Sequence, residues 1–203
     1  MITNREEVLE NAFRVFVRMN YEKASFTEIA KACGLSRAGI IHYYPYKQDL
    51  FVAVVDKFVF QTHHIENKFQ IQGETLAEFI EQYLAGVTST MKRIVALLND
   101  GNSPDGYSPH FHYFHFIAQV RMYYPDIRPK IRQLYEKEYK LWESVIQKAK
   151  DSGEIRPDID VQTAASLFRQ IYLGLSYERS FLEGLNVEEL GKNFRYLYSL
   201  LKA

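Results

Sequence analysis

The chain has 203 residues, in which 25 lysine and arginine residues balance 25 aspartate and glutamate residues. A net charge of zero excludes a uniformly basic protein that coats nucleic acid through charge alone. With 47% hydrophobic and 25% charged residues, the composition is that of a globular protein and excludes a disordered chain.

Apolar residues recur at intervals of three and four through most of the chain, and this period predicts helices. The first predicted helix spans residues 5–20. A second begins at Ser25 and Glu28, whose spacing is typical of a capping box, and ends at Gly34, since glycine tolerates the left-handed conformation. No segment alternates with a period of two for long enough to predict a strand.

A third predicted helix lies between Ser36, a favourable helix cap, and Pro45, whose ring disfavours helical geometry in the residue before it. The helical period resumes at Lys47 and continues toward Phe69. The remaining predicted helices span residues 75–98, 110–124, 127–152, 161–183 and 187–201, and residues 99–109 form the clearest loop. The sequence therefore predicts an all-α fold of about nine helices.

The stretch from Phe26 to Tyr44 joins two short helices by a turn, which is the layout that places a recognition helix in the DNA major groove. Positive charge gathers around it: residues 23–47 carry a net charge of +3, which leaves −3 for the rest of the chain. Clustered lysine and arginine side chains suit phosphate contact. The neutral chain therefore contains a candidate DNA-binding segment.

Two runs of residues in this region form a specific pattern. They are Thr27-Glu28-Ile29-Ala30-Lys31-Ala32-Cys33-Gly34-Leu35-Ser36 and His42-Tyr43-Tyr44-Pro45-Tyr46-Lys47-Gln48-Asp49-Leu50. Together with Phe16 in the first helix, they resemble the N-terminal domain of the TetR family of transcriptional regulators over about residues 5–60. The resemblance implies a helix-turn-helix DNA-binding domain at residues 1–60 and a helical ligand-binding and dimerisation domain at residues 61–203.

The resemblance also assigns contacts with DNA. It implies that Thr27 touches a phosphate and that Arg37, Ala38 and Gly39 face base edges. An arginine fork can pair with guanine O6 and N7, a contact worth roughly 1 to 3 kcal/mol of discrimination. The other residues of the expected DNA-binding set are Ser36, His42, Tyr43 and Lys47.

Two positions depart from the family pattern. Ile41 stands where tyrosine is usual, which removes a hydroxyl that would reach a phosphate. Tyr46 stands where a small polar helix cap is frequent. Neither change disturbs the helical framework, so the expectation of DNA binding stands.

Aromatic residues are abundant beyond residue 60, and too many of them crowd residues 110–116 to face one side of a helix. We expect some to line an apolar cavity for a small-molecule effector. The expected pocket residues are Phe79, Tyr83, Val87, Met91, Phe114, Trp142, Phe168 and Tyr172. The alternative, in which these large side chains only fill a helical core, stays open.

The last two predicted helices carry more apolar surface than chain-terminal helices need for docking alone. In the TetR family these helices pair with their copies in a second subunit, so the resemblance implies a homodimer. The expected interface residues are Ile171, Leu175, Phe194, Leu197, Tyr198 and Leu201. Gly174 would permit close helix approach.

These features together imply a regulator, most often a repressor in this family, that binds a palindromic DNA operator as a homodimer. A small molecule of unknown identity would release it by binding the conformation with misplaced recognition helices. We expect a cytoplasmic protein, since the longest charge-free stretch is too short and too polar to span a membrane.

The alternative is a helical ligand- or metal-binding protein without DNA-binding activity. His112 and His115 would share a helical face, but no carboxylate or cysteine lies near them in the sequence. His63 and Glu66 form one pair, where a di-iron bundle needs two such motifs. We therefore expect no metal and no cofactor.

No sequence motif points to an enzyme: the chain lacks a Gly-x-Ser-x-Gly elbow, a Gly-rich phosphate loop and a His-Glu-x-x-His pair. Its one cysteine, Cys33, cannot form an intramolecular disulfide, and its place in the second predicted helix indicates a small buried apolar side chain.

Overall fold

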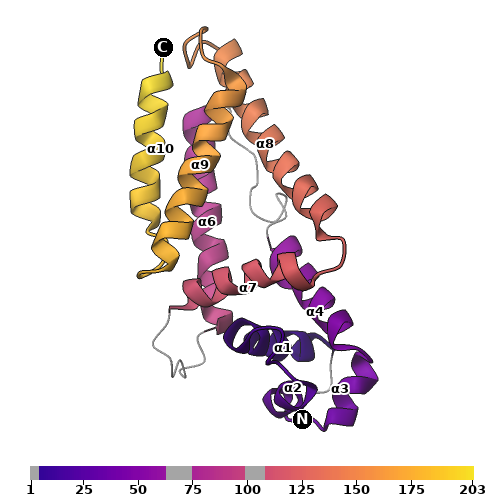
Figure 1. Ribbon diagram of the computed structural model, residues 1–203. Helices are drawn as coiled ribbons and strands as arrows, with labels where there is room; N and C mark the ends of the chain where they lie inside the picture. The colour runs from indigo at the N-terminus through magenta and orange to yellow at the C-terminus, as the bar shows by residue number, and fades with distance from the viewer. Residues whose placement is uncertain (1–4, 63–74, 99–107) are drawn as a thin grey trace. The chain divides into compact units, whose positions relative to one another are not determined.

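The computed structural model describes residues 5–62, 75–98 and 108–203. These residues form nine α-helices and one π-helical segment, with no strand apart from an isolated bridge between Ile155 and Lys202 (Figure 1). The prediction of an all-α fold is confirmed. None of the helices in these ranges is long and apolar enough to cross a membrane.

The chain divides into two compact units. Unit 1 consists of Met1–His63 and Ile94–Lys130, and unit 2 consists of His64–Arg93 and Ile131–Ala203. Unit 1 contains α1 (Arg5–Met19), α2 (Phe26–Cys33), α3 (Arg37–Tyr43), α4 (Lys47–Val55), the π-helix η1 (Asp56–Gln61) and α7 (Pro109–Tyr123). Unit 2 contains most of α6 (Leu76–Leu98) and of α8 (Ile127–Asp151), together with α9 (Val161–Ser180) and α10 (Val187–Leu201).

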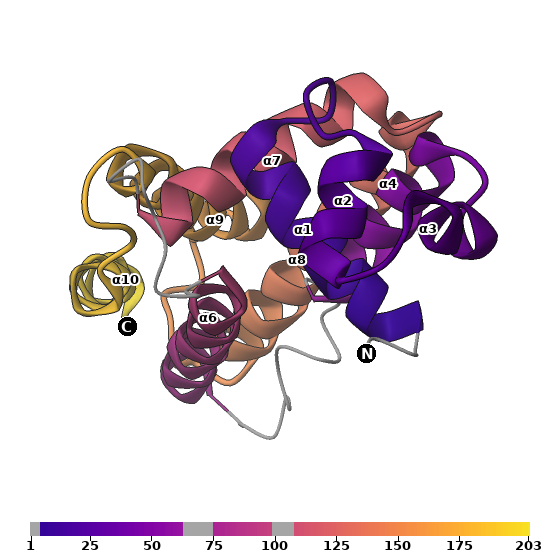
Figure 2. The same cartoon turned by 90° about the horizontal axis from the view of Figure 1, so that it is seen from below.

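Unit 1 has an aromatic core. The rings of Phe13 in α1 and Phe58 in η1 stack with centroids 4.3 Å apart. Phe116 in α7 meets Phe13 edge-on at 5.3 Å and Phe51 in α4 at 5.7 Å. Figures 1 and 2 accordingly show α7 beside α1, although many residues separate them in sequence. Residues 94–130 accordingly belong to unit 1. The two compact units therefore differ from the functional domains at residues 1–60 and 61–203 that the family resemblance implies.

Unit 2 is built around Trp142. Its indole stacks on Phe168 of α9 at 4.6 Å and meets Phe79 of α6 edge-on at 4.8 Å and Phe194 of α10 at 5.7 Å. One aromatic side chain therefore contacts the three other helices of this unit. Each of the four rings is almost inaccessible to solvent.

Local signals place most helix boundaries where the sequence predicts them. At the start of α6, the Thr75 N–H donates to Glu78 Oε2 and the Glu78 N–H donates to Thr75 Oγ1, both at 3.2 Å, which completes the expected capping box. The predicted helix at 161–183 is too long, because α9 ends at Ser180 and a turn leads to Gly184, whose φ of +95° is left-handed.

The helix expected from Lys47 toward Phe69 is α-helical only to Val55 and then widens into η1. Asp56, at the start of η1, accepts hydrogen bonds from Tyr124 Oη at 2.8 Å and from Lys130 Nζ at 2.9 Å. These bonds tie η1 to the end of α7 and to the first turn of α8, both within unit 1. The part of the prediction at residues 63–69 and the loop predicted at 99–107 lie outside the described residues, as does the pair His63 and Glu66.

A buried ion pair, which the sequence analysis missed, lies inside unit 2. Arg169 is 2% exposed and its Nη1 donates to Oε2 of Glu138, which is 7% exposed. The guanidinium carbon lies 4.6 Å from the ring centroid of Tyr139 and 5.2 Å from that of Tyr135. Burial lowers the pKa of Arg169, but a guanidinium starts so far above neutral pH that it stays charged.

Replacing Arg169 with methionine leaves Glu138 buried without its counter-charge. We expect the free energy of unfolding to fall by about 3 to 5 kcal/mol, because an isolated buried charge is strongly destabilising. The double variant Arg169→Met with Glu138→Leu should recover most of the loss, since both charges are then absent. Urea unfolding followed by circular dichroism, at one fixed protein concentration, measures these differences.

The matched control is Arg195→Met, which breaks the pair between Arg195 and Glu81. These side chains are 2.8 Å apart and more than half exposed, so the expected loss is at most about 1 kcal/mol. Equal losses for Arg169→Met and Arg195→Met would contradict the prediction.

Candidate nucleic-acid interface

Local capping shapes the pair formed by α2 and α3. Ser25 Oγ accepts the Glu28 N–H at 3.2 Å and Ser36 Oγ accepts the Gly39 N–H at 3.0 Å, so each helix starts at its expected cap. Between them, Gly34 has a φ of +63°, the left-handed conformation that ends α2 and turns the chain.

The side of α2 and α3 that faces the interior is apolar and buried. Ile29 and Cys33 of α2 and Ile40 of α3 are buried. Burial raises the pKa of the Cys33 thiol to about 11, so the thiol stays protonated at neutral pH. This confirms the interpretation of Cys33 as a small core residue. Tyr44, just after α3, is buried too, and its hydroxyl accepts a hydrogen bond from Arg5 Nε at 2.8 Å.

The outer side carries most of the residues that the sequence assigns to DNA. The exposed members of the expected set are Thr27, Ser36, Arg37, Ala38 and His42, whereas Gly39, Tyr43 and Lys47 are half-buried. Arg37 and Ala38 lie in the first turn of α3 and His42 one turn further on. This arrangement presents a guanidinium, a methyl group and an imidazole on one short exposed helix, which suits contact with base edges.

Lys47 has a structural partner that the sequence did not reveal. Its Nζ donates to the Tyr21 carbonyl at 2.8 Å and lies 4.4 Å from the centroid of the Tyr21 ring. The Tyr21 ring also stacks on Tyr123 of α7 at 4.4 Å within unit 1. Lys47 therefore holds the segment after α1 in place, and its contact with phosphate stays a prediction.

Two exposed residues outside the expected set share this region. Ile41 of α3 is 39% exposed and Tyr46 is 72% exposed. Tyr46 is the cap of α4 but forms no side-chain capping bond. The sequence feature that could have identified these two residues is their departure from the family pattern. Ile41 and Tyr46 place an aliphatic and an aromatic side chain where polar groups are usual.

The expected pocket residues fall into both units. In unit 2 the structure brings together Phe79, Tyr83, Trp142, Phe168 and Tyr172. Val87 also lies in this core, and Met91 packs against it. Phe114 belongs to unit 1. Tyr83 lies 5.0 Å from Trp142 and 5.8 Å from Tyr172, measured between ring centroids. These direct contacts fit the alternative in which the rings fill the core.

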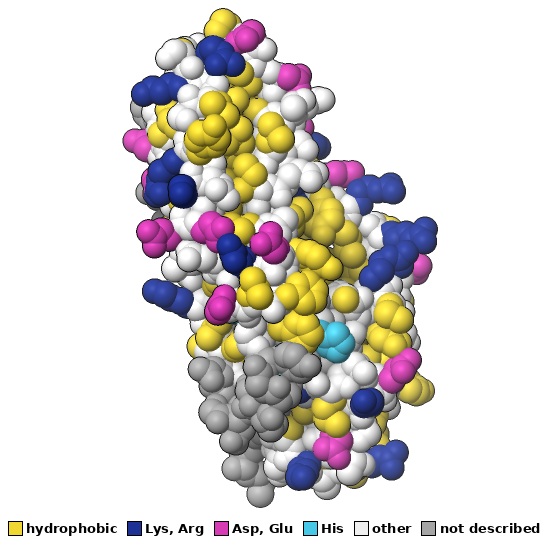
Figure 3. Space-filling view, turned by 60° about the vertical axis from the view of Figure 1, so that its left-hand side comes forward, with side chains coloured by type: hydrophobic (Ala, Val, Ile, Leu, Met, Phe, Trp, Pro, Cys, Tyr) yellow, Lys and Arg dark blue, Asp and Glu magenta, His cyan; other side chains and the backbone are white. Residues whose placement is uncertain are grey.

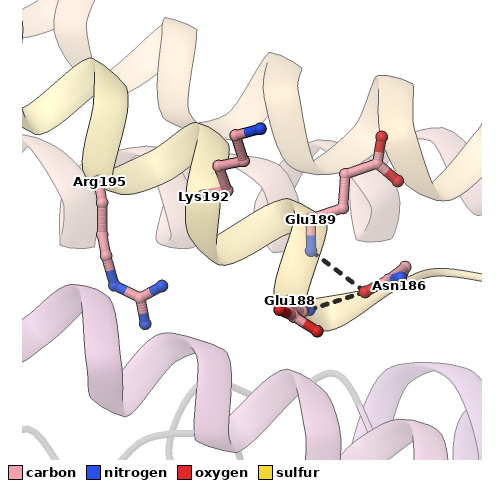
Figure 4. A pocket seen from close by; sticks show the side chains of 5 residues that line it. All are labelled: Asn186, Glu188, Glu189, Lys192 and Arg195. Atoms are coloured by element: carbon pink, nitrogen blue, oxygen red, sulfur yellow. Dashed lines mark hydrogen bonds between the residues drawn. The ribbon is translucent and has the colours of Figure 1, made fainter.

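A hollow of about 590 Å³ lies elsewhere in unit 2, beside the start of α10, and the residues that line it are all polar or charged. Figure 4 shows Asn186 next to the first turn of α10, where its side-chain oxygen accepts the N–H groups of Glu188 and Glu189 at 2.9 and 3.1 Å. Arg195 is paired with Glu81 of α6 through two contacts of 2.8 Å. Asn186 and Arg195 therefore already have partners, and the aromatic residues expected to form an apolar cavity do not line this hollow.

The expected dimer residues separate into two sets. Phe194 and Leu201 are buried within unit 2, and Ile171, Leu175, Leu197 and Tyr198 are half-buried. The exposed apolar residues of α9, α10 and the turn between them are others: Leu167, Leu173, Tyr177, Phe181, Leu182, Tyr196 and Leu200. We call these seven the α9–α10 apolar face. The spacing of four between Leu173, Tyr177 and Phe181 was the signal that could have found it.

Figure 3 looks toward the side that carries α10, and hydrophobic side chains lie exposed there among charged ones. No atom lies within 4 Å of the position that a Cβ of Gly174 would take, so the surface of α9 is open at that point.

The histidines of α7 differ in their surroundings. His112 is buried, and His115 Nδ1 lies 3.3 Å from Gln119 Nε2. Desolvation lowers the pKa of His110, whose two ring nitrogens are buried and have no hydrogen-bond partner among the described residues. Within the described ranges, no group of three histidine, cysteine, aspartate or glutamate side chains could hold a metal ion.

Comparison with known proteins points to one family. The model of "Bacterial regulatory proteins, tetR family" matches residues 8–54. The HTH-type transcriptional repressor AcnR of Corynebacterium efficiens is 38% identical over 53 residues, a match that spans 26% of this chain and 28% of the relative. The sequence similarity is thus concentrated in the part of the chain that contains α2 and α3.

Solved structures extend the likeness to the whole fold. The TetR family regulator PfmR from Thermus thermophilus has a TM-score of 0.68 at 16% identity, over 97% of this chain and 98% of that one. A transcriptional regulator from Saccharomonospora viridis, solved in complex with choline, has a TM-score of 0.59 at 20% identity, over 96% of this chain and 95% of that one.

The two basic residues of the interface should respond differently to replacement. Lys47→Met removes an ammonium that bonds a backbone carbonyl, and we expect the free energy of unfolding to fall by roughly 1 to 3 kcal/mol. Arg37→Met alters an exposed side chain and should change it by less than about 0.5 kcal/mol. Urea unfolding of both variants measures this. Equal stabilities would show that Lys47 has no structural role.

Proposed function

We propose that this chain, whose residues 8–54 match the TetR family model and whose fold is that of TetR-family regulators, is a sequence-specific DNA-binding repressor of that family. It acts in the cytoplasm as a homodimer and is a regulator, not an enzyme. The observation that carries the proposal is the exposed set Arg37, Ala38 and His42 on α3, the second helix of a capped helix pair.

In the proposed interface, some residues contact phosphate and others contact base edges. Thr27 at the start of α2 contacts a phosphate and positions the pair, and Arg37 enters the major groove with its fork toward guanine. The Ser36 hydroxyl accepts a backbone N–H as a cap, so it offers its own proton to a phosphate oxygen. Because α3 has seven residues, each subunit reads a short half-site.

A second subunit covers the α9–α10 apolar face. The seven large side chains of this face are between 40% and 66% exposed, and exposed apolar side chains gathered on neighbouring helices favour an interaction site. Two-fold pairing of this face gives a palindromic operator whose half-sites lie about 34 to 36 Å apart, or a multiple of that distance.

A small molecule bound in the C-terminal helical domain releases the operator. Support comes from the many aromatic side chains of unit 2 and from the choline complex of a protein with the same fold. The effector lowers operator affinity by binding better to the conformation with misplaced recognition helices.

Selection of duplexes from a random pool, followed by fluorescence anisotropy, tests DNA binding. Arg37→Ala should lose about 1 to 3 kcal/mol of discrimination between the selected operator and a random duplex. Thr27→Ala should weaken binding to both duplexes alike, because a phosphate contact carries no sequence information. If the unmodified protein binds operator and random duplex equally at every salt concentration, the proposal fails.

Sedimentation equilibrium tests the dimer. Tyr196→Glu places a charge in the α9–α10 apolar face and should weaken dimerisation by at least about 2 kcal/mol, or roughly thirtyfold. Gly174→Leu adds bulk to an open position of α9 and should weaken the dimer without unfolding the subunit. Met122→Glu, an equally exposed apolar residue on α7, is the control and should stay dimeric. A Tyr196→Glu dimer of unchanged affinity would place the interface elsewhere.

A further inference from the structure

The exposed side of α3 carries two apolar side chains, those of Ala38 and Ile41. Ala38, Ile41 and His42 are spaced by three and four residues and therefore share a face, and Arg37 lies one turn before Ile41. Ala38 and His42 are exposed, and Ile41 is 39% exposed, whereas the adjacent Ile40 is fully buried. Ile41 thus points out of the core that fixes α3, with Arg37 and His42 beside it.

An isoleucine at position 41 restricts the DNA groups that can lie favourably against this part of α3. Its side chain has no donor or acceptor, so it cannot pair with a phosphate or with the polar edge of a base. A polar base edge placed against it would lose its water without gaining a hydrogen bond, which is unfavourable. The one apolar group that base pairs present in the major groove is the C5 methyl of thymine.

We propose that Ile41, supported by the methyl group of Ala38, is a specificity-determining residue that reads a thymine methyl in each operator half-site. The inference rests on the proposed function, since it concerns the DNA that α3 contacts. It assigns a base preference to a position where the family pattern has a tyrosine hydroxyl for phosphate. Isoleucine in place of tyrosine thus replaces a phosphate contact, which positions the helix, by a base contact, which depends on sequence.

The geometry of α3 also sets the spacing of the preferred bases. Arg37 and Ile41 are four residues apart, which is about 6 Å along a helix with a rise of about 1.5 Å per residue. Successive bases of one DNA strand are about 3.4 Å apart along the duplex. A guanine read by Arg37 and a thymine read by Ile41 therefore lie about one or two base steps apart.

The test removes single methyl groups from DNA. After the operator has been selected from a random pool, each thymine is replaced in turn by deoxyuridine, which lacks the C5 methyl and keeps the same hydrogen-bonding groups. For the unmodified protein we expect one position per half-site at which the loss weakens binding about fourfold. That position should lie one or two steps from a guanine whose replacement is tolerated by Arg37→Ala.

The Ile41→Ala variant tests whether Ile41 causes the response to deoxyuridine. It should bind the operator more weakly than the unmodified protein and should lose the response to deoxyuridine at that position, whereas Ile41→Val should keep part of it. Met122→Ala, an exposed apolar residue of α7, should leave the whole deoxyuridine profile unchanged. Circular dichroism of each variant establishes that α3 is still folded.

The outcomes separate this inference from the proposed function. If Ile41→Ala has the same deoxyuridine profile as the unmodified protein, or if no position responds, while Arg37→Ala still loses discrimination, Ile41 does not read thymine and the DNA-binding function stands. If no duplex is selected from the pool, the proposed function fails and this inference fails with it.

Discussion

The recognition helix α3 has seven residues, too few to be stable as an isolated helix in water, so its position depends on its packing. Ile40 on its inner face is fully buried, and Tyr44 directly after it is buried as well. Behind them, Phe116 of α7 contacts both Phe13 of α1 and Phe51 of α4. Because α3 packs on α2 and α2 packs on α1, the placement of α3 depends on a core to which α7, a helix far along the chain, also contributes.

The charged side chains show how strongly position decides their role. Lys47 has the spacing of a phosphate contact, yet its ammonium bonds the Tyr21 carbonyl within unit 1. Arg169 lies in an ordinary amphipathic pattern, yet it is buried with Glu138 at the centre of unit 2. Arg37 forms no hydrogen bond or ion pair within the described residues and is exposed, which leaves it available to a partner. Of these three cations, Arg37 is the one whose surroundings suit the proposed contact with DNA.

Exposed apolar side chains distinguish two surfaces of this protein. A single exposed aliphatic residue such as Ile41 is common on protein surfaces, and it gains meaning from its place beside Arg37 on a helix suited to the major groove. The α9–α10 apolar face gains meaning from its size, because seven such residues follow one another along two adjacent helices. In the proposed function the first surface contributes to sequence selection, and the second pairs two subunits.

The sequence by itself determined the helical fold, most helix boundaries and the DNA-binding motif, because caps such as Ser25, glycine turns and apolar periodicity act within a few residues of each other. The tertiary structure decided which of the many aromatic and apolar residues are buried. Phe194 and Leu201 belong to the core of unit 2 although their spacing suited an interface, and α7 packs with α1. Burial is a property of residues far apart in the chain, so no local pattern contains it.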